Sequence, residues 1–597
     1  MSDTSTGAGP AAGEREDPET AAGPPRTPET AAGVPRTAHG STLPLVPAPG
    51  GRGPGPRAPG EAPVLGRFLA RAAAATAALT VVGALLGLVR DQTVAHFFGA
   101  GGDSDAFLVA WAVPEMAATL LIEDGMALLL VPAFSQVLAR REAARREAAR
   151  RARPGEEPAD PVREFVAATL PRLCLLLTCA AGLLLAGAPW AVGVLAPGLD
   201  DPRLAVDCTR LTAVTVLTFG ITGYFSAALR AHGSFAPPAA VYVAYNVGIV
   251  GMTFAFHALW GVRAAAAGVA AGSVLMVLVQ FPFFAARLRR HKGARGRPGR
   301  AGTRRRDRNG LPPLGLAVLA PVLVFVVSRQ CQVLVERFLA STLPAGAISH
   351  LNYAQKVAQM PMVLSMMICT VTFPVVAQAM ADGDRRGARL RVERDLALAA
   401  LVVLLGTATV VAYAPQIIEV LFQRGAFDAQ DTRTTAGVMR VYALGLLGHT
   451  LVGALGRPFF SAGRPSWYPA FAMVTGLVVT TGAGFAVTYH WGVLGIAAAN
   501  AAGISTTAVL LLSGLGSRVV AIEVRAVSLS LVRLTVPAAA AGAAGWSAAP
   551  LTGGALPSLA AGCLLVPAVF VLTGRALRTP EVVHLLALTR QRFLHGH

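Results

Sequence analysis

Charged residues make up only 14% of this 597-residue chain and aromatic residues only 7%, whereas hydrophobic residues make up 54%. A soluble domain carries roughly a quarter charged residues, so this balance excludes an ordinary soluble protein and indicates a lipid solvent. Abundant Gly and Ala with few aromatic rings favour helices that pack closely through small residues. The alternating short segments of a β-barrel are lacking. We therefore expect an all-α polytopic membrane protein.

Motifs that bind nucleotides or carry out hydrolysis are also lacking. The chain contains no GxxxxGK[ST] loop, so it holds no sign of an ATP-driven pump. It contains no HExxH, GxSxG or paired CxxC motif either. We expect no enzyme activity, no cofactor and no metal site. Any transport is expected to be passive, ion-coupled or powered by a partner.

Cysteine is scarce, with six residues in the whole chain. All six lie in or beside apolar segments without metal-ligand spacing, which predicts small buried hydrophobes rather than disulfides or ligands. They are Cys174, Cys179, Cys208, Cys331, Cys369 and Cys563.

Lysine is nearly absent, since Lys292 and Lys356 are the only two among 52 basic residues. This bias toward Arg, together with the Ala richness, indicates a GC-rich genome and a bacterial producer. The formal charge of +19 would suit a nucleic-acid partner if the basic residues formed a patch. They are instead concentrated between apolar runs, so we expect no nucleic-acid partner.

Residues 1–63 are rich in Pro, Gly, Ala and Thr and contain a ten-residue duplication. Pro18 to Thr27 reads PETAAGPPRT, and Pro28 to Thr37 reads PETAAGVPRT. Such a segment cannot bury enough apolar area to offset its ordering entropy, which predicts a disordered tail. It also lacks the short apolar core of a signal peptide.

Fourteen apolar segments near the roughly 20 residues needed to cross a bilayer follow this tail. We expect spans at 68–96, 105–134, 164–188, 205–230, 237–259, 263–287, 312–340, 346–380, 395–414, 434–461, 467–489, 493–515, 526–547 and 555–576. They suggest an N-terminal bundle at 64–290, a basic linker at 291–310, a C-terminal bundle at 311–520 and two further helices with a short tail at 521–597.

Basic residues in the connections predict the orientation. The loops after spans two, six and eight are rich in Arg, whereas the loops after spans one, seven, eleven and thirteen contain no Lys or Arg. Both termini are therefore expected in the cytoplasm. Topology alone accounts for these loops more simply than lipid-head recognition does. The stretch Leu138 to Arg151, LARREAARREAARR, predicts a helix that extends into the cytosol or lies on anionic lipid.

Ionisable residues inside apolar spans are the candidates for function, because the bilayer makes them costly. One group belongs to spans one and two, and the other to spans seven and eight. The first contains Arg90, Asp91, Asp105, Glu115, Glu123 and Asp124, and the second contains Arg329, Glu336, Arg337, His350 and Lys356.

Several of these candidates also have a simpler structural explanation. Arg90 and Asp91 can form an ion pair at the interface, and Asp105 can be a residue that favours a helix start. Glu336 and Arg337 fit an interfacial pair better than a site. Like His350, the lone His449 is expected to pack or form hydrogen bonds.

Lys356 is harder to dismiss as structural, because it stands near the start of a long apolar stretch in a protein that otherwise uses Arg. Prolines at 114, 361, 374 and 458 interrupt expected spans and predict kinks. Such kinks let a bundle alternate between inward-open and outward-open forms.

Several collinear motifs resemble one family. The run GLVRDQTVAHFFGAGGDSDAFLVAWAVPEM, Gly87 to Met116, looks like the first two helices of the MurJ/MviN lipid II flippases. VERFLAS at 335–341, NYAQKVAQMP at 352–361, EVLFQRGAFD at 419–428 and YALGLLGHTLVGALGRPFFSAGRPSWYP at 442–469 resemble that family's seventh to tenth helices. The likeness covers about residues 65–520 and identifies a divergent, actinobacterial-type member.

This resemblance implies a flippase of the superfamily that also contains MATE exporters. Two six-helix bundles would form a V around a cationic cavity, with two C-terminal helices making a groove for the lipid tail. The substrate would be lipid II, undecaprenyl-pyrophosphate carrying the disaccharide-peptide of peptidoglycan, moved across the bacterial cytoplasmic membrane by alternating access. Membrane lipids and cell-wall synthesis proteins are further candidate partners.

The resemblance also implies the substrate-binding residues Arg90, Asp105, Lys356 and Glu123, with Asp91, Glu115 and Arg329 as additional cavity charges. Lys356 replaces the family's usual Arg. The chain departs from the family at three positions that often carry basic residues, which are here Ala84, Ala112 and Ala118. Three arginines are candidates to compensate for this loss, namely Arg172, Arg210 and Arg329.

Two other functions fit the sequence. A MATE-like exporter of organic cations would use the embedded carboxylates Glu115, Glu123 and Asp124. A scaffold that does not transport would recruit cell-wall machinery through the tail and the basic loops.

Overall fold

The computed structural model describes residues 62–123, 125–151, 160–289, 316–366, 384–461, 466–518 and 523–583. By its internal contacts the chain divides into Met1–Val64 and Leu65–His597, and the elements below belong to the second unit, apart from the first three residues of α1. The predicted disordered tail lies outside the described residues, except at its last two positions. So do Asp124, Cys369, Pro374 and the expected basic linker at 291–310.

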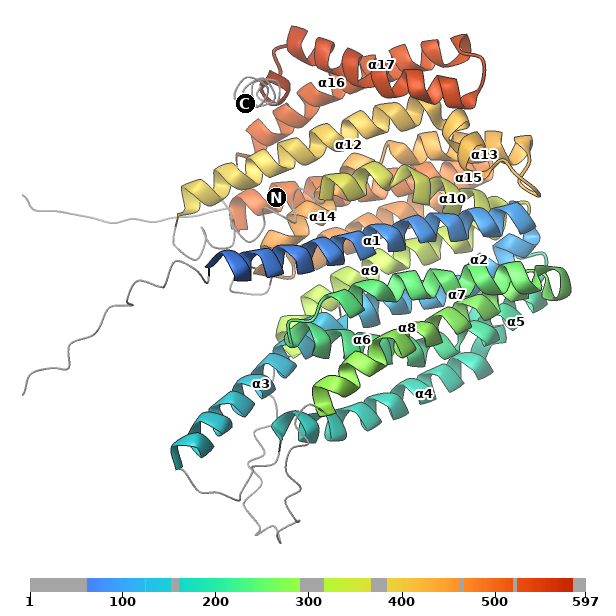
Figure 1. Cartoon of the computed structure of the whole chain (residues 1–597). Helices are drawn as coiled ribbons and strands as arrows, with labels where there is room; N and C mark the ends of the chain where they lie inside the picture. The colour runs from blue at the N-terminus through green and yellow to red at the C-terminus, as the bar shows by residue number, and fades with distance from the viewer. Residues whose placement is uncertain are drawn as a thin grey trace, which may run out of the picture. The chain divides into compact units, whose positions relative to one another are not determined.

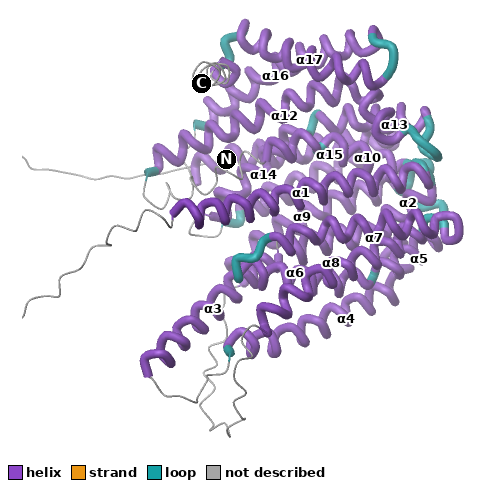
Figure 2. The backbone as a smooth tube through the Cα atoms, viewed as in Figure 1, coloured by secondary structure: helices purple, strands orange, loops and turns teal. Residues whose placement is uncertain are grey.

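Every regular element of the described residues is a helix (Figure 2). The first half contains α1 (Ala62–Phe98), α2 (Gly102–Ala118), a π-helical turn (Thr119–Glu123), α3 (Gly125–Arg151), α4 (Pro161–Leu195), α5 (Pro202–Thr212), α6 (Val214–Ala231), α7 (Ala236–Trp260) and α8 (Arg263–Arg289). The second half contains α9 (Leu316–Ala340), α10 (Ala347–Ala358), α12 (Arg385–Phe422), α13 (Ala429–Ala443), α14 (Leu446–Ser461), α15 (Tyr468–Arg518), α16 (Val524–Ala548), a 3-10 turn (Ala549–Leu551) and α17 (Ala555–Ala576).

Ten of the described helical segments are long and apolar enough to cross a membrane, or eleven if the bent pair α13 and α14 counts as one span. The protein is thus an all-helical, multi-pass membrane protein. The difference from the expected fourteen has identifiable sources. Two expected spans, 467–489 and 493–515, are continuous in α15, which turns at Gly492 with φ 54°. The expected span at 346–380 is only partly described.

The helices gather in two groups (Figure 1). Helices α2 to α8 lie together, while α12 to α15 lie together with α16 and α17 packed beside α12. Close approach through small residues, predicted from the composition, is confirmed between α7 and α8. A Cβ added at Gly248 would collide with the backbone of Gly272. This contact lets the two helices approach without intervening side chains.

Helix α1 contacts both groups. Asn246 of α7 donates its Nδ2 hydrogen to the Gly83 carbonyl of α1 at 3.0 Å. On the other side, Gln92 of α1 donates to the Leu421 carbonyl of α12 at 2.9 Å. Of the α1 side chains between these contacts, those of Arg90 and Asp91 are buried, whereas those of Leu85 and Val89 are exposed.

A proline inside a helix has no N–H to donate. The carbonyl four residues before it therefore lacks its usual hydrogen-bond donor. Pro415 in α12 frees the carbonyl of Val411, and Arg440 of α13 donates its Nε hydrogen to that oxygen at 3.0 Å. The same guanidinium lies over the ring of Trp546 of α16, 3.7 Å from its centroid. Arg440 thus joins α12, α13 and α16 at a break in α12, where Tyr413 has non-helical φ and ψ.

Arg440→Ala should destabilise the protein by about 1–3 kcal/mol, because the Val411 carbonyl would lose its partner in an apolar setting. The midpoint of thermal unfolding of the purified protein in detergent checks this. Arg433→Ala is the matched control, since Arg433 is exposed on the same helix. Equal shifts for the two variants would contradict a special role for Arg440.

Two local predictions have different outcomes. The predicted helix at Leu138 to Arg151 is confirmed, because α3 continues to Arg151, and Arg146 pairs with Glu142 one turn earlier at 3.8 Å. The prediction of buried cysteines is wrong for Cys179 and Cys563, which are exposed. Hydropathy placed them in spans but does not tell which face of a helix meets lipid and which meets protein. Cys208 is buried as expected.

Candidate functional site

Arg90 of α1 is 9% exposed, and its guanidinium donates hydrogen bonds to two side chains. Its Nη1 donates to Asn246 Oδ1 of α7 at 3.0 Å, while its Nε and Nη2 donate to Asp91 Oδ1 at 3.1 and 2.9 Å. The Arg90–Asp91 ion pair expected from the sequence is therefore confirmed. The pair lies buried between helices.

Lys356 of α10 joins this pair from the other side. Its Nζ lies 3.5 Å from the same Asp91 oxygen, and its side chain is 23% exposed. Trp111 of α2 contacts both cations, because the Arg90 Cζ and the Lys356 Nζ are each 4.2 Å from its ring centroid. The face of the indole attracts both charges. A single carboxylate and a single ring thus hold two cations that come from distant parts of the sequence.

A second ion pair lies next to this group. Arg337 of α9 donates its Nη2 to Glu115 Oε2 of α2 at 3.0 Å and its Nη1 to the Leu108 carbonyl. Leu108, Trp111 and Glu115 follow helical spacing, which places them on one face of α2. We call the whole group the cation cluster, consisting of Arg90, Asp91, Trp111, Glu115, Arg337 and Lys356.

The cation cluster contains three cations and two carboxylates, so its net charge is one positive. Arg90 and Lys356 share Asp91, and Arg337 is paired with Glu115. An anionic ligand can therefore be attracted by the excess charge. It would exchange partners with the two carboxylates to bind each cation fully.

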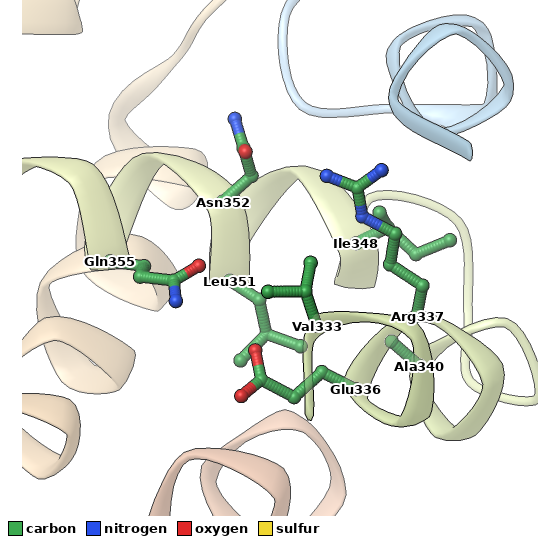
Figure 3. Close-up of a pocket in the computed structure, with 8 residues that line it drawn as sticks. All are labelled: Val333, Glu336, Arg337, Ala340, Ile348, Leu351, Asn352 and Gln355. Atoms are coloured by element: carbon green, nitrogen blue, oxygen red, sulfur yellow. The ribbon is translucent and has the colours of Figure 1, made fainter. Parts of the chain in front are cut away.

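A narrow cavity lies beside Arg337 (Figure 3). Its volume is about 10 Å³, which is room for about one water molecule. The cavity is bounded by α9 and α10, and the polar side chains Glu336, Arg337, Asn352 and Gln355 line it. In Figure 3 the Glu336 carboxylate and the Arg337 guanidinium point in different directions from α9. The prediction that these two residues pair with each other at the interface is therefore wrong.

Glu336 belongs instead to a buried hydrogen-bond network in the second group of helices. Asn500 of α15 donates to its Oε1, and His449 Nε2 lies 3.1 Å from Asn500 Oδ1. Tyr442 connects His449 to Gln355 of α10, with distances of 3.1 and 2.8 Å. The network links α9, α10, α13, α14 and α15. The expectation that His449 forms hydrogen bonds is confirmed.

Asp105 does not lie in the cation cluster but holds the start of α10. Its Oδ2 accepts from the Gly346 backbone N–H at 2.7 Å, and its Oδ1 accepts from the Ser349 backbone N–H and hydroxyl at 2.8 and 2.5 Å. It stands in the first turn of α2, as expected, but its carboxylate faces the N-terminus of another helix. The positive end of the α10 dipole favours this placement.

Other contacts close the same end of the protein. The Ala426 N–H, which follows α12, donates to the His96 carbonyl of α1 at 2.9 Å. His350 Nδ1 lies 2.8 Å from Thr435 Oγ1, so the prediction that His350 forms hydrogen bonds is also confirmed. The name latch is used here for the contacts of Asp105 with Gly346 and Ser349 and of His96 with Ala426. The latch joins α1 and α2 to α10 and to the α12–α13 connection.

Some predicted site residues lie elsewhere. Glu123 is exposed, and its Oε1 accepts from the Tyr242 hydroxyl of α7 at 2.5 Å. Arg329 is exposed on α9, and Arg172 and Arg210 are exposed on α4 and α5. None of these three arginines is a member of the cation cluster. Arg90, Asp91, Glu115 and Lys356 are the predicted residues that the structure brings together.

Sequence reasoning missed Trp111 and Asn246 and underrated Arg337. Trp111 carried a usable signal, because it stands one turn before Glu115 and so shares a helix face with an ionisable residue. Asn246 is an amide inside an apolar span, which is also costly in lipid unless it is paired. Arg337 and Glu336 are neighbours in the sequence but lie on different faces of α9. Which helix each face meets depends on packing, which the sequence does not show.

Two of the solved structures that share this fold are similar to most of this chain. A lipid II flippase MurJ in an inward closed conformation aligns with a TM-score of 0.66 at 17% identity, over 84% of this chain and 99% of that one. An inward-facing multidrug resistance MATE family transporter of the MOP superfamily aligns with a TM-score of 0.56 at 14% identity, over 76% and 99%. The chain thus has the helical membrane fold of the class to which these two proteins belong.

The sequence comparison identifies the family within this class. The profile of the Lipid II flippase MurJ family matches residues 94–560, and the chain belongs to this family. It is 26% identical to the Lipid II flippase MurJ of Burkholderia cenocepacia over 470 residues, which are 75% of this chain and 84% of that protein. It is 25% identical to the probable lipid II flippase MurJ of Haemophilus influenzae over 494 residues, 79% and 91% of the two chains. The family consists of transporters and not of enzymes.

The MATE-like exporter is disfavoured by the carboxylates it would need. Glu115 is paired with Arg337, and Glu123 accepts a hydrogen bond from Tyr242. Asp124 lies outside the described residues. Carboxylates that are already paired with a cation are poor sites for an organic cation, since the ligand would have to displace the partner.

Proposed function

We propose that this chain moves lipid II from the inner to the outer leaflet of the bacterial cytoplasmic membrane by alternating access. Membership of the Lipid II flippase MurJ family supports the activity. The observation that carries the proposal is the meeting of Arg90 from α1 and Lys356 from α10 around Asp91 and Trp111. These two cations come from different halves of the chain. The affinity for a ligand that contacts both cations therefore depends on how the two halves are arranged.

The chemistry of the headgroup fits this group of residues. A diphosphate must leave water to enter a membrane protein, and it needs cations and hydrogen-bond donors in exchange. A guanidinium such as that of Arg90 can donate two parallel hydrogen bonds to phosphate oxygens, whereas the ammonium of Lys356 acts as a point charge. Asp91 keeps the two cations close to each other before the substrate arrives. Arg90, Lys356 and Asp91 are thus assigned to headgroup binding and positioning.

The loops after spans one and seven, which contain no basic residues, meet at the latch, and this supports an orientation with both termini in the cytoplasm. In this orientation the contacts of Asp105 with Gly346 and Ser349 lie on the outward side, so this conformation of the protein is closed to the outside. Binding of the headgroup from the cytoplasm would exchange ion-pair partners in the cation cluster. Opening of the latch would then release the headgroup outward. Asp105 is therefore assigned to gating and not to substrate contact.

The substrate is assigned as undecaprenyl-pyrophosphate carrying the disaccharide-peptide of peptidoglycan, in a GC-rich, actinobacterial-type producer. Ala84, Ala112 and Ala118 leave the α1 and α2 side without the additional cations seen elsewhere in the family. Alanine has no charged group, so these positions add no charge around Arg90. Ala84 is exposed, and Ala112 is buried in the core. Membrane lipids and cell-wall synthesis proteins remain the further partners that we propose.

Complementation tests the function. A bacterial strain depleted of its own lipid II flippase should regain growth and cell shape when it expresses this chain, because headgroup transport is restored. Depletion of a peptidoglycan scaffold protein provides the comparison, and this chain should not rescue that strain. Rescue of the scaffold strain without rescue of the flippase strain would favour the scaffold alternative and contradict the proposal.

A further inference from the structure

Arg337 is a buried cation in a position where burial is costly. Its side chain is 6% exposed, whereas the side chain of its partner Glu115 is 39% exposed. Its second hydrogen bond goes to the backbone carbonyl of Leu108, which carries no formal charge. The guanidinium is therefore fixed in the protein, while its one carboxylate partner lies at the more open side. Of the two, Glu115 is the group that can move into water.

The position of Arg337 matters because α2 contributes no cation of its own to the cation cluster. The residues of α2 in the cluster are Trp111 and Glu115, and nearby Ala112 and Ala118 carry no charge. The exposed arginines of α4, α5 and α9 do not replace them. Arg337, reaching across from α9 to the Leu108 carbonyl, supplies a positive charge at the α2 surface.

We propose that Arg337 is a third headgroup-binding cation and that Glu115 is its displaceable counterion. This inference rests on the proposed function and names a further specificity residue of the same site. A phosphate oxygen and a carboxylate oxygen accept the same charge-assisted hydrogen bonds from a guanidinium. The diphosphate of the substrate takes the place of Glu115 Oε2 on Arg337, and Glu115 turns toward water.

Displacement of Glu115 also changes the contact between the two halves. The Glu115–Arg337 pair connects α2 with α9, so its exchange for a substrate oxygen removes a direct link between the halves and replaces it with the ligand. The buried charge of Arg337 stays neutralised throughout, which avoids the high cost of an unpaired buried ion. This exchange couples headgroup binding to the arrangement of the two halves relative to each other.

The test is binding of purified full-length protein to lipid II in nanodiscs, with four variants. Arg337→Gln should weaken binding by about tenfold to a hundredfold, the loss expected for hydrogen bonds to a charged group. Glu115→Gln should strengthen binding several-fold, because the competing carboxylate is gone while an amide oxygen still accepts from Arg337. Arg337→Lys keeps the charge and should bind with intermediate affinity. Arg263→Gln is the matched control, since it breaks an exposed pair with Asp207.

The opposite effects of the two partners distinguish a counterion from a structural bridge. If Glu115→Gln and Arg337→Gln weaken binding equally, the pair only joins the helices and the inference is overturned. If Arg337→Gln binds lipid II as the parent does, the inference is also overturned, while the proposed function stands. Failure of the parent itself to bind lipid II would overturn the proposed function together with the inference. Thermal unfolding of each variant confirms that it is folded.

Discussion

Replacement of Arg90 and Lys356 by alanine together should abolish transport and lower the affinity for lipid II by more than about a hundredfold. The cation cluster of the parent contains three cations and two carboxylates. Removing Lys356 brings its net charge to zero, and removing Arg90 as well makes it negative. A diphosphate would then be repelled by Asp91, which would no longer be neutralised, while Glu115 would stay paired with Arg337. The loss of several charge-assisted hydrogen bonds adds to this repulsion.

Rescue of a flippase-depleted strain and lipid II binding in nanodiscs measure this effect. Lys356→Arg should retain activity, because the positive charge is kept. Arg263→Ala removes an exposed cation and should behave as the parent does. Full rescue by the double variant would show that buried cations do not bind the headgroup.

Asp105→Ala should give the second large effect, a strong loss of transport with a shift toward states that are open at the latch end. The variant loses three hydrogen bonds, to the Gly346 and Ser349 N–H groups and the Ser349 hydroxyl. Each hydrogen bond to a charged group contributes about 1.5–3 kcal/mol. Loss of all three can move a two-state equilibrium by several powers of ten.

Distances between spin labels at Arg203 and Ala429 report on this end, in a background without native cysteines. Both positions are exposed, one on α5 and one on α13. The distance distribution should broaden and lengthen in Asp105→Ala. Asp103→Ala is the matched control, because Asp103 is exposed in the same first turn of α2. An unchanged distribution in Asp105→Ala would contradict a gating role.

The sequence predicted the helical membrane fold and the residues that carry charge, but not their pairing. Arg90 next to Asp91 is a local pattern, and its ion pair could be foreseen. The contact of Lys356 with Asp91 joins residues 265 positions apart and depends on how two groups of helices meet. Asp105 could be assigned to a helix start from its own neighbours. That it serves α10 and not α2 follows from tertiary packing.

Helix faces account for the other differences. Glu336 and Arg337 are adjacent in the sequence, so their side chains leave α9 about 100° apart. They therefore meet different neighbours. Arg337 reaches Glu115 and Glu336 reaches Asn500. Trp111 was overlooked for a related reason. Its ring contacts two cations at once, and that geometry does not exist until α1 and α10 are both beside α2.

Exposure of lipid II on the outer face of living cells tests the proposed transport most directly. In cells that depend on this chain, exposed lipid II should fall when the chain is depleted, return with the parent, and stay low with the Arg90→Ala and Lys356→Ala double variant. Undiminished exposure after depletion, or full recovery with the double variant, would contradict headgroup transport by these buried cations.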